Sequence, residues 1–374
     1  MRLVELRNER DSVAACSAVG RAVADENLRG WGAILPLEAT SFLQALQESG
    51  VAVLRGSGRA LALGSLSQLW NAGRSLEDAL TRHADLAREL REKAAGIESP
   101  AAGSAWKLPR SALPIGRVLV MGVVNATPDS FSDGGAYDPA AQAEKLVDEG
   151  ADIVDVGGES TRPRAEPVDA ATERKRVEPV LRALSRAKVP ISIDTTKSEV
   201  AKAALDLGAE IVNDVSGLSR DPRMGEAARG AAVLLMHSRG TPADMGQRAN
   251  YQDIQAEILD ELGQALARAR EAGIPDERIA LDPGLGFAKV GPQNFTVLRR
   301  LRELTQLGKP LVVGASRKSF IGQVTGRDAP DRLFGSVAAA VAAALNGAAV
   351  VRAHDVRATR EALLVADAIR TASN

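Results

Sequence analysis

The sequence of 374 residues has a single cysteine, Cys16, and only 3% of its residues are aromatic. One cysteine excludes a disulfide framework within the chain, so we expect a protein of the reducing cytoplasm. The formal net charge of -1 gives no reason to expect nucleic acid or an anionic membrane as a partner. No apolar run approaches the roughly 20 residues of a membrane helix, and the charged residues 1–12 contain no apolar signal core.

The chain does contain eight short apolar runs rich in Val and Ile, and each ends at or near a polar residue. These runs are 118–124, 153–156, 191–193, 211–212, 233–236, 279–281, 311–313 and 350–351. Amphipathic helical stretches separate them, including the longer ones at 251–272, 292–307 and 328–346. Buried parallel strands that alternate with helices predict a (β/α)8 TIM barrel, whose active site lies at the carboxyl ends of its strands.

A boundary precedes the barrel. All three tryptophans lie before residue 110, and a stretch rich in Pro, Gly, Ala and Ser follows at 99–104. We therefore expect residues 1–110 to form a separate N-terminal extension that holds the tryptophans, and residues 115–374 to form the barrel. The extension is predicted to be small and α/β or mainly helical, with helices at 42–48 and 76–93 and a strand pair at 51–54 and 60–63. The extension contains no recognisable group of catalytic residues, which favours a role in packing or assembly.

Several strand ends carry residues capable of chemistry. Asp194 and Asp282 each end a strand, and a single Asp at such a place is as often a structural loop cap as a ligand-binding group. Two such acids at the mouth of one barrel favour a ligand-binding role for both. Arg352 and His354, two residues apart on the eighth strand, point to the same side and can clamp a phosphate group. Lys318 begins a short helical turn, where an isolated lysine is usually a solvated surface group.

Eight motifs together carry a resemblance to a known family. They are Asn125–Gly135 (NATPDSFSDGG), Gly158–Pro163 (GESTRP), Ser192–Thr195 (SIDT), Asn213–Val215 (NDV), Met236–His237 (MH), Asp282–Phe287 (DPGLGF), Ser316–Phe320 (SRKSF) and Arg352–Asp355 (RAHD). In this order they resemble the dihydropteroate synthases of the pterin-binding barrel superfamily, from about residue 115 to the C-terminus. The first hundred or so residues fall outside the family pattern.

The resemblance implies a reaction. 7,8-Dihydropterin-6-ylmethyl diphosphate condenses with 4-aminobenzoate to give 7,8-dihydropteroate and diphosphate, Mg²⁺ is required, and the enzyme is a homodimer that we expect to pair through its last helices. The implied pterin site consists of Asp194, Asn213, Asp282 and Lys318. The implied aminobenzoate site consists of Thr161, Arg162, Pro163, Phe287 and Ser319. Arg352 and His354 would hold the departing diphosphate and, with Lys318, act in catalysis, and Asn125 would be the Mg²⁺ ligand.

The residue types suit these roles. One carboxylate can accept the paired N–H groups of a pterin edge, and a helix N-terminus at Ser319 favours an anion. His237 follows the fifth strand, and its role is left open. Arg164 stands where the family typically has Gly, in the loop that follows the second predicted strand. Because Arg adopts positive φ less readily than Gly, we predict a different path for this second loop.

Three rival interpretations remain. A corrinoid methyltransferase of the same superfamily would share the Asp and Asn contacts, but it has no use for the SRKS turn or the Arg-x-His pair. A Schiff-base aldolase would use Lys318, although lysines with that role lie within a strand. A non-catalytic pterin-binding homologue should lack some of the motif residues, and here all of those sought are present.

Overall fold

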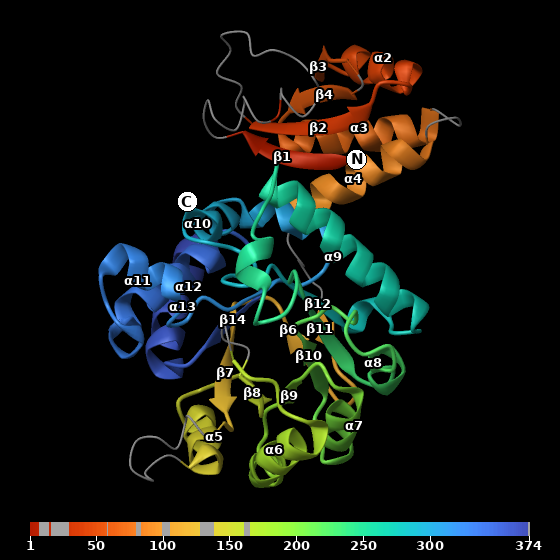
Figure 1. Cartoon of the computed structure of the whole chain (residues 1–374). Coiled ribbons are helices and arrows are strands. Elements are labelled where there is room, and N and C mark those ends of the chain that lie inside the picture. The colour runs from red at the N-terminus through yellow and green to blue at the C-terminus, as the bar shows by residue number, and fades with distance from the viewer. Residues whose placement is uncertain are drawn as a thin grey trace. The chain divides into compact units, whose positions relative to one another are not determined.

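The computed structural model describes residues 1–6, 15, 30–57, 59–79, 84–98, 105–127, 138–160 and 165–372. The chain divides into two compact units, coloured along the sequence in Figure 1. The first unit is Met1–Pro100 with Arg302–Gly308, and the second is Ala101–Leu301 with Lys309–Asn374. No helix among the described residues is long and apolar enough to cross a membrane.

The first unit is an antiparallel sheet with helices. Its strands run in the order β1-β2-β4-β3, with bounds β1 (Arg2–Leu6), β2 (Gly30–Pro36), β3 (Ala52–Arg55) and β4 (Arg59–Gly64). Its helices are α2 (Thr40–Glu48), α3 (Leu66–Ala79) and α4 (Ala84–Glu98). Phe42, Leu69 and Leu90 are fully buried in its core. The helix at 42–48 and the strand pair are confirmed, whereas the single helix predicted at 76–93 is wrong, because α3 and α4 are separate helices.

Strand β1 is an edge strand whose outer side is covered by side chains from far along the chain. The Gln306 side-chain amide both accepts from the backbone N–H of Leu3 and donates to its carbonyl, each at 3.0 Å. Glu303 accepts from the backbone N–H of Glu5 at 3.3 Å. The helix predicted at 292–307 is therefore wrong: α10 (Pro292–Arg299) ends, a 3₁₀ segment η4 (Leu301–Leu307) follows, and most of that segment belongs to the first unit.

The second unit is the expected barrel of eight parallel strands. They are β7 (Leu119–Asn125), β8 (Ile153–Gly157), β9 (Ile191–Asp194), β10 (Ile211–Asp214), β11 (Ala232–Met236), β12 (Ile279–Asp282), β13 (Val312–Val313) and β14 (Val350–Ala353). They follow the order β12-β11-β10-β9-β8-β7-β14-β13, and a parallel bridge from Leu281 to Leu311 joins the two ends of the sheet. All eight predicted strands are confirmed to within a few residues, and so is the barrel.

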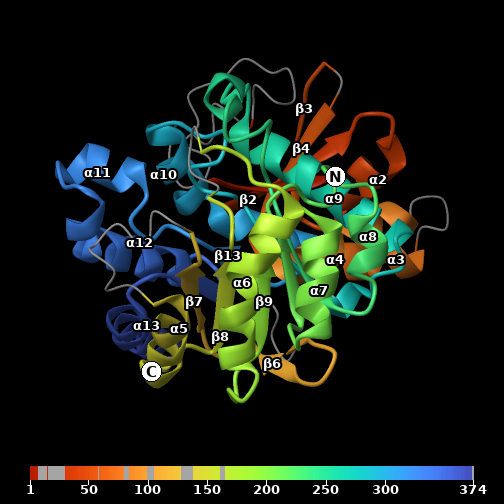
Figure 2. The ribbon, with the colours of Figure 1, turned by 60° about the horizontal axis from the view of Figure 1, so that its bottom comes forward.

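Helices cover the outside of these strands, as Figure 2 shows for α5, α6 and α7 beside β7, β8 and β9. The helices of this unit are α5 (Pro139–Asp148), α6 (Ala170–Leu184), α7 (Ser198–Asp206), α8 (Met224–Ala227), α9 (Ile254–Glu271), α10, α11 (Ser319–Thr325), α12 (Leu333–Leu345) and α13 (Val356–Thr371). Short 3₁₀ turns are η2 (Met245–Arg248), η3 (Asp276–Arg278) and η5 (Ala329–Asp331). Asp138, Asp169 and Asp253 cap the N-termini of α5, α6 and α9 by accepting backbone N–H bonds.

A hairpin closes the end of the barrel where the strands begin. Strands β5 (Ala105–Lys107) and β6 (Ala112–Pro114) pair antiparallel, and Trp106 is fully buried between them and the barrel core. Its indole N–H donates to the carbonyl of Arg278 at 3.0 Å. The expectation that all tryptophans belong to the N-terminal extension is thus wrong for Trp106, because composition alone does not show which core a side chain enters.

Candidate active site

The polar residues predicted at the strand ends lie in register across neighbouring strands. Asn125 of β7 pairs with Gly157 of β8, Gly157 pairs with Asp194 of β9, and Asp194 pairs with Asn213 of β10. Since all these strands are parallel, the side chains emerge at the same level of the barrel mouth. The fold therefore brings together residues that are scattered along the sequence.

A chain of polar contacts crosses this mouth. The Arg352 guanidinium donates through Nε to Asp155 Oδ2 at 2.6 Å and through Nη2 to Asp194 Oδ2 at 2.9 Å. The Asn213 amide donates to the same Asp155 oxygen at 3.1 Å. Sequence reasoning did not select Asp155, which is fully buried. A charge within the apolar run 153–156 was the available signal, because a carboxylate is rarely buried without a partner.

Burial and neighbouring charge set the ionisation of these groups. Burial raises the pKa of Asp194 to about 7; Arg352 opposes this shift and Asp155 adds to it. Asp194 Oδ1 is buried and has no hydrogen-bond partner in the described part of the chain. Such an oxygen costs free energy unless a donor reaches it.

A second group of residues surrounds the end of β12. Asp282 is buried, which raises its pKa, and its Oδ1 accepts from the backbone N–H of Gly284 at 2.7 Å. The Lys318 ammonium donates to the carbonyl of Leu285 and lies 4.9 Å from the centre of the Phe287 ring. Burial lowers the pKa of Lys318 to about 8, while Asp282 pulls it upward. Lys318 is therefore not the solvated surface lysine that its position on a helical turn first allowed.

The two groups are adjacent. A Cβ built on Gly314 would lie 3.7 Å from the Arg352 side chain and 3.9 Å from Lys318 Nζ. The charge of Asp282 also acts on both Lys318 and Arg352. The acids, amide, lysine and arginine predicted from separate motifs thus converge at one rim.

A cavity of about 280 Å³ opens over the carboxyl ends of β8 to β12. Its walls include Asp194, Thr195, Val215, Arg220, Met245 and Phe287. Apolar atoms make up most of the exposed lining surface, and the polar side chains of Asp194, Thr195 and Arg220 are set among them, as in a site for a small organic molecule. Asp194 and Phe287 connect this cavity to the two groups of residues described above.

The remaining predicted residues are placed as follows. His354 follows β14, and its Nδ1 lies 3.0 Å from Ser316 Oγ. Asn125 is the half-buried last residue of β7, and Ser319 is the exposed first residue of the short helix α11. Thr161, Arg162, Pro163 and the neighbouring Arg164 lie outside the described residues, as do residues 128–137 after β7.

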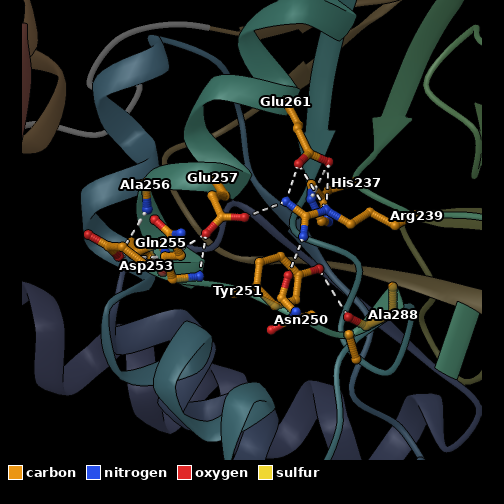
Figure 3. Close-up of polar contacts among 12 residues, drawn as sticks. His237, Arg239, Asn250, Tyr251, Asp253, Gln255, Ala256, Glu257, Glu261 and Ala288 are labelled. Carbon is orange, nitrogen blue, oxygen red and sulfur yellow. Dashed lines mark hydrogen bonds and ion pairs between the residues drawn. The ribbon is translucent and has the colours of Figure 1, made fainter. Parts of the chain in front are cut away.

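His237, whose role was left open, is buried beside helix α9. Its Nε2 lies 3.1 Å from Glu261 Oε2, and Arg239 donates to Glu257 and Glu261 while its guanidinium packs 4.0 Å from the centre of the Tyr251 ring (Figure 3). Burial lowers the pKa of His237 to about 4, so the ring is neutral near pH 7. It contributes to a structural network behind the site.

A partly buried ion cluster beside the loop after β8 was also missed. Lys197 Nζ lies 2.6 Å from Glu159 Oε2 and 2.5 Å from Glu173 Oε2. Glu159 also accepts from the backbone N–H of Val168 at 3.1 Å. These contacts hold the two described ends of the loop together. The charges on separate helices and loops gave no local sequence signal for this pairing.

Residues 121–354 match the model of the family described as "Pterin binding enzyme", and this match assigns the barrel to that class of protein. A dihydropteroate synthase of Synechocystis is 45% identical over 273 residues, which cover 69% of this chain and 94% of the relative. The chain belongs to this family and is, more narrowly, a dihydropteroate synthase, a transferase of folate biosynthesis.

Solved structures of dihydropteroate synthases support the same family assignment. The Yersinia pestis dihydropteroate synthase, in complex with a sulfonamide drug, has a TM-score of 0.69 at 39% identity and covers 72% of this chain and 100% of its own. The Thermus thermophilus enzyme in complex with 4-aminobenzoate has a TM-score of 0.65 at 45% identity and covers 71% of this chain and 99% of its own. The similarity therefore extends over nearly the whole length of these relatives.

Proposed function

We propose that the chain condenses 7,8-dihydropterin-6-ylmethyl diphosphate with 4-aminobenzoate, using the residues that converge at the barrel mouth. The observation that carries this assignment is the contact chain from Asn213 through Asp155 and Arg352 to Asp194. It supports the assignment because it joins carboxylate and amide groups to a guanidinium, and Asp194 of this chain of contacts lines the cavity. The non-catalytic alternative requires that some of the motif residues be missing, and the sequence contains all of those sought.

Pterin recognition is assigned to Asp194, Asp282, Asn213 and Lys318. A pterin edge offers a ring N–H beside an exocyclic amine, and a carboxylate accepts both in parallel. Asp194 Oδ1, which has no hydrogen-bond partner among the described residues, is one acceptor that such an edge would satisfy. An analogue without these donors would leave the acid unpaired, which makes the site selective.

The aminobenzoate site is assigned to the Phe287 side of the cavity. The Phe287 ring supplies an apolar surface under the Lys318 ammonium. Ser319 begins α11 next to Lys318, within reach of a substrate carboxylate in this proposal. Thr161, Arg162 and Pro163 complete the site in the family pattern, and their assignment rests on the motif alone.

The departing diphosphate is assigned to Arg352 and His354. Among the described residues, no group of three His, Cys, Asp or Glu side chains could hold a metal ion. Mg²⁺ accepts few protein oxygens beside water and substrate phosphates, so the amide oxygen of Asn125 together with the diphosphate fits it. When bound, the ion would neutralise charge on the leaving group.

The protein mainly positions two flat molecules and stabilises an anion. The bond between the pterin methylene and the diphosphate oxygen breaks, and its electron pair leaves with diphosphate beside Arg352. The dihydropterin ring delocalises the positive charge left on the methylene. The neutral aromatic amine then attacks this carbon and loses one proton, so that no strong base is required.

A homodimer is proposed as the assembly. In the described part of the chain, the exposed large apolar side chains all fall between residues 290 and 369, and Phe334 is 86% exposed. Leu364, Val365 and Ile369 are exposed on α13, which packs on α12. Light scattering should give twice the chain mass, and a monomeric mass would contradict the dimer.

A cytoplasmic location is proposed from the single cysteine.

The decisive test is incubation of the purified chain with both substrates and Mg²⁺. Dihydropteroate and an equal amount of diphosphate should appear. Tight pterin binding without product would support the non-catalytic homologue instead.

A second experiment tests the aldolase interpretation. Borohydride in the presence of a carbonyl compound should trap no adduct on Lys318, whereas a trapped adduct would support the aldolase.

A further inference from the structure

Lys289, in the loop after β12, is a lysine whose amino group is entirely internal, and burial lowers the pKa of this group well below its ordinary value. The residue is 5% exposed, and its Nζ donates to the carbonyls of Gly284 and Phe287, each at 3.0 Å. Nζ also lies 2.8 Å from His237 Nδ1. An ammonium has three N–H donors and no acceptor, so these three partners match its capacity.

The loop that contains Lys289 includes a strained residue. Gly284 and Gly286 have φ values of +66° and +78°, which glycine adopts freely, whereas Ala288, which has a Cβ, has φ +47°. A Cβ on Gly284 would collide with the carbonyl oxygen of His237. Backbone of this kind persists only where the surrounding contacts hold it. The two carbonyl bonds from Lys289 are contacts of this sort.

His237 and the residues that contact it hold the amino group of Lys289 in turn. With Lys289 donating to Nδ1, the neutral His237 ring carries its proton on Nε2, the nitrogen that faces Glu261. Arg239 holds Glu261 in place, with Nε 2.9 Å from Oε1 (Figure 3). The network therefore runs from helix α9 through His237 to the loop after β12.

This loop carries the groups assigned to the substrates. Its Gly284 N–H holds the Asp282 carboxylate, and its Leu285 carbonyl accepts from Lys318. Its Phe287 ring lines the cavity. Arg352 and His354, assigned to the leaving group, lie on or just after β14, and Arg352 donates to Asp155 and Asp194 on the opposite side of the mouth from β12.

We propose that Lys289 is a positioning residue, which fixes the loop from Asp282 to Phe287 and thereby the affinity for both substrates. The proposal rests on the assignment of Asp282 and Phe287 to the substrate site. Loss of the ammonium should weaken binding far more than turnover at saturation, because the leaving-group residues stay in place. A purely structural role would lower kcat with the folded fraction and leave each KM unchanged.

Lys289→Met, which keeps the length of the side chain without its donors, tests the proposal on the full-length protein. We expect KM for 4-aminobenzoate and for the pterin diphosphate to rise about tenfold, equivalent to about 1.4 kcal/mol, with kcat within about threefold of the parent. Lys289→Arg should restore part of the affinity. Lys202→Met, at an exposed position on α7, is the matched control and should leave both constants unchanged.

Unchanged KM values in Lys289→Met would overturn the proposal, as would a kcat that falls in step with the folded fraction measured by circular dichroism. If Lys289→Met does not fold, Glu261→Gln tests the same network from the far side of His237. Its side chain is one-third exposed, and KM values raised two- to fivefold would support the network, whereas unchanged values would refute it. Phe287→Ala is measured in parallel: if it leaves KM for 4-aminobenzoate unchanged, the substrate-site assignment fails rather than the role of Lys289.

Discussion

Arg352 Nη2 donates to Asp194 Oδ2 at 2.9 Å, although 158 residues separate the two along the chain. The same guanidinium holds Asp155 through Nε. A planar guanidinium can bind two carboxylates in fixed directions, whereas an ammonium is a single point charge. The proposed pterin acceptor and the proposed leaving-group cation are therefore coupled through one side chain.

Arg352→Lys should consequently lose activity although the charge is kept. Lysine cannot hold both carboxylates and also present directed donors to diphosphate. We expect kcat/KM for the pterin substrate to fall about 100-fold, within the range for loss of a donor to a developing anion. Steady-state kinetics with saturating 4-aminobenzoate measures this. Turnover equal to the parent in either Arg352→Lys or Arg352→Ala would contradict the leaving-group assignment.

Asp155 should matter as much as the motif residues, although it touches no substrate in the proposed mechanism. Asp155→Asn keeps the shape but removes the charge that pairs with Arg352. A charged hydrogen bond contributes about 1.5–3 kcal/mol, so kcat/KM should fall roughly 10- to 100-fold. Asp148→Asn, at an exposed position on α5, is the control. Equal kinetics for the two variants would show that the buried pair is not needed.

The pH dependence of kcat/KM should be bell-shaped. The pKa of Asp194 is raised to about 7, so below this pH the acid is neutral and cannot accept both pterin donors. The pKa of Lys318 is lowered to about 8, so above this pH the amine loses its charge. Activity should therefore rise through about pH 7 and fall through about pH 8.

Two variants assign the limbs of this profile. Asp194→Asn should abolish the rising limb, and Lys318→Met should abolish the falling limb, each at reduced activity. The measurement is kcat/KM for the pterin diphosphate from pH 5 to 10. A profile of Asp194→Asn that keeps the rising limb would assign that limb to another group.

Gln306 should stabilise the first unit, although it lies in the sequence of the barrel. Gln306→Ala removes both bonds to the backbone of Leu3 and leaves buried groups unpaired, which costs about 1–3 kcal/mol. Hydrogen exchange at the Leu3 amide should accelerate, and exchange in the barrel strands should not. Gln44→Ala, at an exposed position on α2, is the control. Slow exchange at Leu3 in Gln306→Ala would show that the edge of β1 is held by other contacts.

The amino-acid sequence alone determined the barrel and the location of its site. Apolar runs ending in Asp194, Asn213 and Asp282 are local patterns, and parallel strands bring their ends to one rim whatever the details of packing. The family motifs added the identity of the ligands. Even the strand pair of the N-terminal unit could be predicted from two short apolar runs on either side of a glycine-containing segment.

Only the tertiary structure decided how those residues are connected. Asp155 was visible as an acid in an apolar strand, but its pairing with Arg352 crosses 197 positions, and the Gln306–Leu3 pairing crosses 303. The break after α10, the entry of Trp106 into the barrel core and the burial of Lys289 against His237 likewise depend on segments distant in sequence. Hydrogen bonds and burial between such segments form only when the chain is folded, so local periodicity carries no trace of them.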